Sequence, residues 1–231
     1  MNYSRILLKL SGEAFSGHDN LGISKEALAY AIREIKVIHT LKVEAALVIG
    51  GGNFLRGSQT AFLDRAVADQ MGMLATIMNG LALAEALHQE KIPALLQSAV
   101  ATPWTDPIQP ARAKKALANG EVVIFAGGTG NPFVTTDTAA AIRASEIGAD
   151  ALLKATQVDG VYSADPKKDS NAKRFERVGY DQAIKKNLAV MDMAAFDLCR
   201  QNRVPIIIFD FYKKGNLNKI VLGQSIGTLV S

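Results

Sequence analysis

Residues suited to binding phosphate gather at positions 127–137, where the sequence reads GGTGNPFVTTD. Glycines allow backbone amides to converge on an anion, and Thr135 and Thr136 add hydroxyl donors. The alanine-rich segment that follows predicts a helix from Thr138, whose N-terminus supplies unpaired N–H groups and the positive end of the helix dipole. The stretch therefore predicts a phosphate-binding loop.

Asp137 is the unexpected member of this loop, because a carboxylate stands where an anion should bind. An acid is useful at that place if it orients a neighbouring lysine or a magnesium ion. The loop therefore indicates phosphoryl transfer and not only phosphate capture.

Two segments nearer the N-terminus carry matching cations. Lys9 lies inside the apolar run at 6–10, and a lysine in a strand that is covered on both faces needs a nearby anion. A strand-end lysine that reaches out to water is the simpler explanation of that segment taken alone. Three consecutive glycines at 50–52 permit close backbone approach to a phosphate, and the guanidinium of Arg56 can bridge phosphate oxygens.

Near-continuous apolar runs predict strands that are covered on both faces, as in a parallel sheet. They lie at residues 6–10, 45–49, 94–96, 122–126, 151–153 and 205–209. Helical patterns lie between them, at residues 25–40 with Ser24 as N-cap, about 66–90, 111–119, 138–147 and about 192–202. The alternation predicts an α/β fold, a three-layer α/β/α sandwich with a mostly parallel central sheet. Phosphate-compatible groups follow several of these runs, so we expect them to meet at one edge of the sheet.

The composition is that of a globular chain. Of 231 residues, 48% are hydrophobic and 21% charged, which excludes disorder and suffices for one large domain. The net charge of +4 suits anionic ligands, but the basic residues are scattered and have no aromatic residues between them, which argues against nucleic acid. The densest basic cluster, at 167–177, is typical of a solvated loop.

Cysteine and histidine usage excludes further classes. Cys199 is the only cysteine and lies in a helical pattern, so we expect it to pack in the core of a protein from a reducing cytoplasm. The histidines at 18, 39 and 88 lack ligand spacing, which leaves a zinc site without support. No export leader or membrane-length apolar run is found, so we expect a soluble cytoplasmic protein without a membrane partner.

Common nucleotide-binding signatures are missing from the sequence: it has no G-x-x-x-x-G-K-[ST], no complete G-x-G-x-x-G, and neither H-R-D nor D-F-G. P-loop, Rossmann and protein-kinase sites are therefore excluded. Six blocks instead resemble the amino-acid kinase superfamily, and within it the bacterial-type uridylate kinase branch, which transfers phosphate from ATP to UMP. The blocks are KLSGEA at 9–14, IGGGNFLRG at 49–57, ADQMGMLATIMNGLAL at 68–83, GTGNPFVTTD at 128–137, KATQVDGVYSADP at 154–166 and VMDMAAF at 190–196.

The resemblance implies a site shared by two nucleotides within a single domain at 1–231, where about 1–150 mainly binds UMP and about 151–231 mainly binds ATP. The implied catalytic residues are Lys9, Arg56, Asp137 and Asp192. The implied ATP contacts are Lys9, Leu10, Ser11, Gly12, Gly52, Arg56, Thr156, Tyr162 and Asp165. The implied UMP contacts are Gly51, Asp69, Thr129, Gly130, Asn131, Pro132, Phe133, Val134, Thr135 and Thr136. Asp192 is equally well explained as a helix N-cap.

The resemblance also implies partners and regulation. Mg²⁺ would accompany ATP, with no protein ligand assigned to the metal. GTP would activate and UTP inhibit, and the candidate GTP loop comprises Gly17, His18, Asp19, Asn20, Leu21 and Gly22. A homohexamer is implied as well. The small residues Ala68, Gly72, Ala75 and Gly80 would let a second helix approach closely, although core packing explains them too.

The hypothesis from the sequence is in-line transfer of the ATP γ-phosphoryl group to UMP, a step of pyrimidine nucleotide biosynthesis. The UMP phosphate is already ionised near neutral pH, so cations and amides that offset charge repulsion matter more than a general base. Two alternatives stay open at this point: a sister kinase that acts on an amino-acid carboxylate, and a non-catalytic nucleotide sensor or storage protein of the same fold.

Overall fold

The computed structural model of the chain describes residues 3–17, 21–55, 62–164, 171–185, 188 and 190–231. Its described strands form one sheet in the order β4-β3-β5-β2-β1-β6-β8-β9-β7, and each pairing between these strands is parallel except that of β8 with β9. The strands are β1 (Arg5–Leu10), β2 (Glu44–Ile49), β3 (Ala94–Ser98), β4 (Asp106–Pro107), β5 (Val122–Ala126), β6 (Ala151–Thr156), β7 (Arg177–Val178), β8 (Ile206–Asp210) and β9 (Thr228–Val230).

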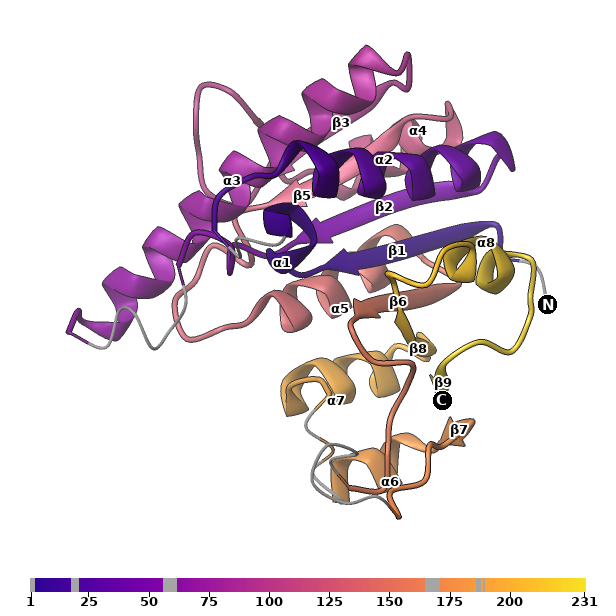
Figure 1. Ribbon diagram of the computed structural model, residues 1–231. Coiled ribbons are helices and arrows are strands. Elements are labelled where there is room, and N and C mark those ends of the chain that lie inside the picture. Colours follow the sequence, from indigo (N-terminus) through magenta and orange to yellow (C-terminus); the bar gives the residue numbers. More distant parts are fainter. Residues whose placement is uncertain (1–2, 18–20, 56–61, 165–170, 186–187, 189) are drawn as a thin grey trace.

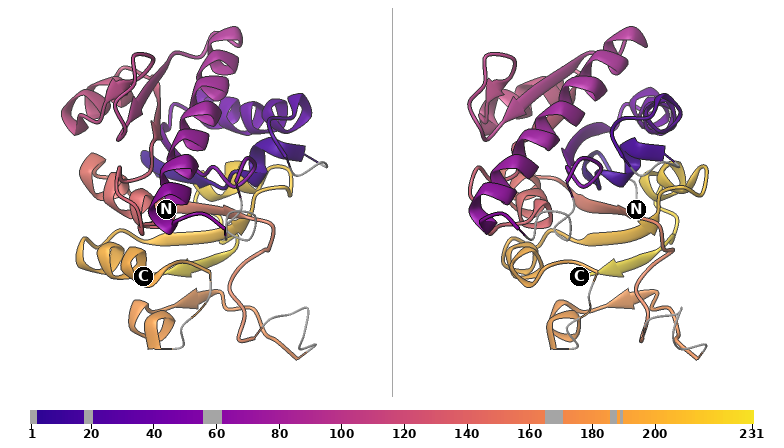
Figure 2. Two further views of the ribbon diagram at one scale, coloured as in Figure 1. Left: turned by 90° about the vertical axis from the view of Figure 1, so that its left-hand side faces the viewer. Right: turned by 60° about the vertical axis from the view of Figure 1, so that its left-hand side comes forward.

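Helices cover both faces of this sheet, which confirms the α/β class with a mostly parallel sheet (Figure 1). They are α1 (Glu13–Ser16), α2 (Lys25–Thr40), α3 (Arg65–Gln89), α4 (Pro110–Ala118), α5 (Thr136–Ile147), α6 (Tyr180–Lys185), α7 (Met193–Gln201) and α8 (Asn216–Val221). One core cluster joins the sheet to α2, α3 and α8, and a second joins it to α4, α5, α6 and α7. Figure 2 shows the same layers from the side.

The two central strands present alternate residues to the two clusters. In β1, Ile6, Leu8 and Leu10 enter the cluster of α2, whereas Leu7 enters the cluster of α5. Side chains alternate along a strand, so Lys9 takes the next position on the α5 face. Lys154 follows Leu152 in the same way on β6, and the register pairs it directly with Lys9. Two lysines therefore replace apolar residues at one level of an otherwise apolar face.

The predicted long elements are confirmed, with small differences at their ends. α5 begins at Thr136 and not at Thr138, because the Thr135 hydroxyl accepts hydrogen bonds from the amides of Asp137 and Thr138 and caps the helix. β6 extends to Thr156, three residues past the apolar run. The short elements α1, α6, α8, β4, β7 and β9 have too few residues to show a periodic pattern.

One expectation from composition is confirmed. Cys199 is fully buried on α7, as predicted, and its burial raises the pKa of the thiol to about 12. Among the helices of the described residues, none combines the length and apolar character that crossing a bilayer requires.

Candidate active site

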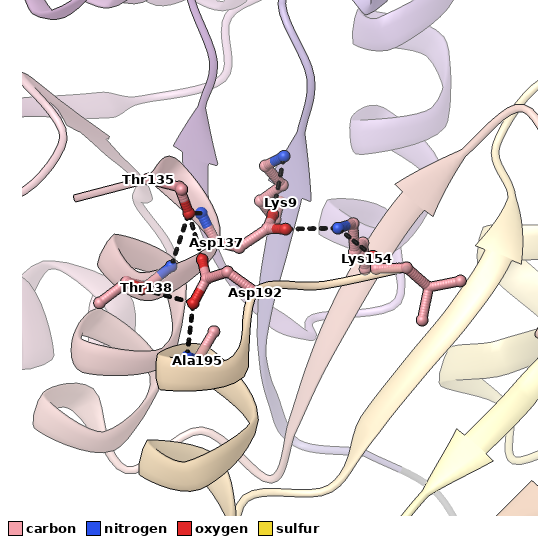
Figure 3. Close-up of polar contacts among 8 residues, drawn as sticks. Lys9, Thr135, Asp137, Thr138, Lys154, Asp192 and Ala195 are labelled. Carbon is pink, nitrogen blue, oxygen red and sulfur yellow. Dashed lines mark hydrogen bonds and ion pairs between the residues drawn. The ribbon is translucent and has the colours of Figure 1, made fainter. Parts of the chain in front are cut away.

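A carboxylate held between two ammonium groups lies at the carboxyl end of the central strands (Figure 3). The Nζ atom of Lys9 is 2.9 Å from Asp137 Oδ1, and the Nζ atom of Lys154 is 2.5 Å from Asp137 Oδ2. Lys154 also donates to the backbone carbonyl of Val190. The three side chains are about nine-tenths buried. A lysine in a strand covered on both faces needs a nearby anion, and for Lys9 that anion is Asp137.

The electrostatics of this triad favour the ionised carboxylate. Burial alone would raise the pKa of Asp137, but the neighbouring Lys9 and Lys154 ammonium groups outweigh burial and hold that pKa below its usual range. The pKa of Lys154 is lowered, chiefly because burial disfavours its charged form, and Asp137 opposes this effect. The triad thus concentrates positive charge at the N-terminus of α5, where the helix dipole adds to it.

Lys154 is the residue that sequence reasoning missed. The predicted strand ends with the apolar run at Leu153, so the lysine that follows falls outside it. The available signal is its likeness to Lys9, because RILLKL and ALLKAT both place a lysine directly after two leucines in an apolar strand. Parallel register brings the two together, and this register is not visible in either segment alone.

Asp192 links the two helices behind the triad. Its carboxylate accepts hydrogen bonds from the amide of Ala195 (2.8 Å), from the Thr138 hydroxyl (2.8 Å) and from the Thr135 hydroxyl, so it caps α7 while holding the start of α5 (Figure 3). The N-cap interpretation is confirmed. Its contacts make Asp192 a positioning residue for the first turn of α5.

Two glycine turns lie beside the triad. The turn at 50–52 follows β2 and lies against Gly12, where a side chain is excluded because an added Cβ would lie 2.3 Å from the Gly52 amide nitrogen. The turn after β5 has positive φ at Gly127, Gly128 and Gly130. Both turns lie at the edge of the sheet where β1 ends, one residue after Lys9, and glycine turns of this kind can offer backbone amides to an anion.

A cavity of about 720 Å³ opens between α3 and these turns, within the size range of small-molecule sites. Six of the predicted UMP contacts line it: Gly51, Asp69, Thr129, Asn131, Val134 and Thr136. The predicted ATP contact Gly52 lines it as well. The Thr135 hydroxyl is committed to capping, so Thr136 is the threonine of this pair that lines the cavity.

Asp69 joins α3 to the predicted UMP loop. Its carboxylate accepts from the amide of Phe133 at 2.7 Å and pairs with Arg65 at 3.0 Å. Phe133 has φ of 67°, a left-handed conformation that is unusual outside glycine, and the Arg65 guanidinium lies 5.9 Å from its ring centroid. The carboxylate is therefore fixed in direction at the cavity wall.

The remaining predicted residues are only partly gathered here. Thr156 ends β6, where the carbonyls of Val158 and Phe209 share its single hydroxyl proton, and the Tyr162 hydroxyl donates to Asp159. Neither lines the cavity beside Asp69. Arg56, Asp165, His18, Asp19 and Asn20 lie outside the described residues. Gly17 and Gly22 adopt positive φ, and Leu21 is exposed.

Taken together, a parallel α/β sheet whose carboxyl edge offers paired lysines, two amide-rich turns and an open cavity defines a phosphoryl-transfer class of site. The model of the amino acid kinase family matches residues 4–210, and the chain belongs to that family.

Solved structures agree with this assignment. The chain is similar to a UMP kinase from Bacillus anthracis, with 37% identity and a TM-score of 0.97, covering 100% of this chain and 97% of that one. It is similar to a UMP kinase from Ureaplasma parvum, with 36% identity and a TM-score of 0.93, covering 100% of both chains. A uridylate kinase from Archaeoglobus fulgidus matches at 27% identity and a TM-score of 0.76, again over 100% of both chains.

Proposed function

We propose that the protein is a UMP kinase that converts UMP and ATP to UDP and ADP, in pyrimidine nucleotide biosynthesis. The observation that carries the proposal is the cavity between α3 and the 127–137 loop, which reaches Thr136 one residue before the lysine-bound Asp137. A nucleoside monophosphate in this cavity would direct its phosphate to the lysines. The names of the full-length structural matches support this substrate.

In the proposed reaction a UMP phosphate oxygen attacks the γ-phosphorus of ATP, and the bond from that phosphorus to the β,γ-bridging oxygen breaks. No proton needs to be removed, because the attacking phosphate is already ionised. Lys9 and Lys154 would offset the charge that gathers on the transferring group. Asp137 would keep both ammonium groups at one place and in their charged form, and Asp192 would hold the helix that carries Asp137.

We propose that Mg²⁺ enters with ATP and is held by its phosphates. Among the described residues there is no group of three or more His, Cys, Asp or Glu that could cage a metal ion, and the Asp137 carboxylate is engaged by two lysines. A site whose one central carboxylate is already paired with lysines fits a magnesium ion that takes its ligands from substrate phosphates and water. When bound, the ion neutralises phosphate charge.

ATP is proposed to bind on the other side of the triad, over the ends of β6 and β8, so that residues about 1–150 serve UMP and about 151–231 serve ATP. Ser11, Gly12 and Gly52 are well placed to supply amides to its phosphates, since their turns touch each other beside Lys9. Thr156 and Tyr162 would border the adenosine. Arg56 and Asp165 are carried into the proposal from the sequence alone.

We propose a cytoplasmic homohexamer that GTP activates and UTP inhibits. Core packing explains two of the small residues of α3, because Gly80 packs on Leu96 and Ile49 and Ala75 is buried. The other two, Ala68 and Gly72, line the cavity. The outer face of α3 instead exposes an apolar stripe of Val67, Met71, Leu74, Met78 and Leu81. Steps of three and four residues are typical of a helix that packs on another helix, here from a second copy.

A phosphotransfer assay tests the function. The purified chain with Mg-ATP is given UMP, CMP, acetylglutamate or glutamate, with and without GTP or UTP, and the products are separated chromatographically. UDP as the main product supports the proposal, provided that a Lys154→Met sample prepared in parallel is almost inactive. Preference for an amino acid, or tight UMP binding without UDP, would refute it.

A further inference from the structure

Asn53 and Asn79 form a reciprocal pair of buried side-chain amides. The Nδ2 atom of Asn53 donates to Asn79 Oδ1 at 2.9 Å, and the Nδ2 atom of Asn79 donates to Asn53 Oδ1 at 2.8 Å. Asn53 is 1% exposed and Asn79 is fully buried. Buried amides are costly unless they are hydrogen-bonded, so this pair has a strong geometric preference for its observed arrangement.

The second N–H of each side-chain amide donates to the backbone carbonyl of a glycine. Asn79 donates to the carbonyl of Gly50 at 2.8 Å, and Asn53 donates to the carbonyl of Gly22 at 2.7 Å. The Asn53 carbonyl in turn accepts from the amide of Gly22 at 2.8 Å. All four side-chain N–H groups of the pair are therefore used, and α3 is joined through Asn79 to the first glycine turn.

Thr76, one turn before Asn79 on the same helix face, holds the second glycine turn. Its hydroxyl accepts from the amide of Gly127 at 2.7 Å while donating to the carbonyl of Met73 at 2.6 Å. Thr76 is 2% exposed. The spacing of Thr76 and Asn79 on one rigid helix thus sets the separation of the turns at 50–52 and 127–130.

Asn53 also restricts the space available to the turn that follows β1, at Gly12. A Cβ added at Gly12 would lie 2.6 Å from the backbone nitrogen of Asn53 and 2.7 Å from its side-chain Oδ1 atom, so the turn after β1 packs directly on Asn53. Displacement of Asn53 would therefore shift the Gly12 turn and the Gly52 amide together.

We propose that Asn53 and Asn79, with Thr76, are positioning residues that align donor and acceptor phosphates by fixing both glycine turns to α3. This inference rests on the proposed phosphotransfer between two nucleotides. None of the three needs to touch the transferring group. Displacement of a turn by about 1 Å can cost about a hundredfold in rate, so the effect falls on turnover more than on substrate binding.

The test compares Asn79→Leu and Asn79→Ser with Gln97→Leu in the full chain. Gln97 is also a fully buried amide, but its hydrogen bonds go to the backbone of Gln109 at the start of α4 and to neither turn. Hydrogen exchange is followed at amides whose bonds define the first turn, those of Gly22, Gly50 and Phe54. Thermal unfolding, kcat and KM for UMP are measured on the same samples.

The proposal expects both Asn79 variants to exchange faster at these three amides and to lose about tenfold or more in kcat, with a smaller change in KM. Asn79→Ser, which keeps one donor, should retain more turnover than Asn79→Leu. Gln97→Leu should change the unfolding temperature without changing exchange at the turn or kcat.

Two results would overturn the proposal: exchange at the three amides as in the unaltered chain, or a kcat per folded molecule that falls no further than in Gln97→Leu. If the unaltered chain made no UDP at all, the proposed function would fail instead. The exchange measurement would then still decide whether the amide pair fixes the turn.

Discussion

Lys9 and Lys154 are register partners on adjacent parallel strands, and their ammonium groups approach opposite oxygens of the single Asp137 carboxylate at 2.9 and 2.5 Å. Like charges on neighbouring strands repel unless an anion lies between them. The carboxylate supplies that anion in the free protein. A phosphate that enters at the N-terminus of α5 would share the same two cations.

Replacing Lys154 by methionine tests its place in the reaction. Methionine keeps an unbranched chain but removes the charge, so we expect kcat to fall on the order of a hundredfold, since one preorganised donor contributes roughly 3 kcal/mol in such sites. Steady-state kinetics with UMP and Mg-ATP measure the effect. The matched control is Lys36→Met, at an exposed ion pair with Glu90, which should leave kcat unchanged. Equal activity of the two variants would remove Lys154 from the mechanism.

Asp137→Asn should destabilise the free protein and make it respond to anions. Breaking a buried ion pair by removal of one partner costs about 3–5 kcal/mol, and here both lysines lose their counter-ion. Inorganic phosphate should therefore raise the unfolding temperature of this variant more than that of the unaltered chain, because it replaces the lost charge. Calorimetry in phosphate and in chloride at equal ionic strength compares them, and an equal response would contradict the arrangement.

The same substitution has a pH signature. Since the pKa of Asp137 in the folded protein lies below its usual value, its contribution to stability is complete above the unfolded pKa of about 3.9 and is lost as the pH falls through the lower folded pKa. Urea unfolding of both proteins should show a stability difference that is constant near neutral pH and shrinks in acid. A difference that grows in acid would mean that the pKa is raised.

Asp69 is expected to recognise the ribose of UMP. Its carboxylate is aimed by Arg65 and by the Phe133 amide, and a hydrogen bond to a charged group contributes about 1.5–3 kcal/mol. Asp69→Ala should raise KM for UMP about tenfold or more and abolish the preference for UMP over its 2′,3′-dideoxy analogue. Arg65→Ala, which removes only a largely exposed partner, should have the smaller effect. A preserved preference in Asp69→Ala would exclude ribose recognition.

Thr76 offers a pair of variants that separates the hydroxyl from the side-chain volume. Thr76→Val keeps the shape but leaves the buried Gly127 amide without its acceptor, at a cost of about 1–3 kcal/mol, whereas Thr76→Ser keeps the acceptor. Turnover of UMP with Mg-ATP, measured as kcat, should be clearly lower in the valine variant than in the serine variant. The reverse order would show that packing of the methyl group, and not the hydrogen bond, shapes the turn.

The apolar stripe on α3 predicts the assembly. Leu74 is 53% exposed at its centre, so Leu74→Asp should place a charge in the interface between copies and lower the mass measured by light scattering. Leu222, which is 46% exposed outside the stripe, gives the control Leu222→Asp. If both variants keep the mass of the unaltered chain, α3 does not form the interface.

The local elements and most of the chemistry-bearing groups can be predicted from the sequence alone. Apolar runs and helical periods report the burial of each segment separately, so β5 and α2 were predicted with their observed bounds. A lysine in an apolar strand and an aspartate in a phosphate loop are likewise local anomalies, which is why Lys9 and Asp137 could be selected before their contact was known.

Which of these groups meet depends on contacts between distant segments of the folded chain. The pairing of Lys9 with Lys154 depends on strand register, the cap shared by Thr135 and Asp192 depends on how α5 packs on α7, and the amide pair of Asn53 and Asn79 depends on α3 lying over β2. Each contact joins segments that are distant in the chain and is selected by burial and hydrogen bonding of the whole sheet. A periodic pattern carries no information on these partners, because it records whether a residue is covered and not what covers it.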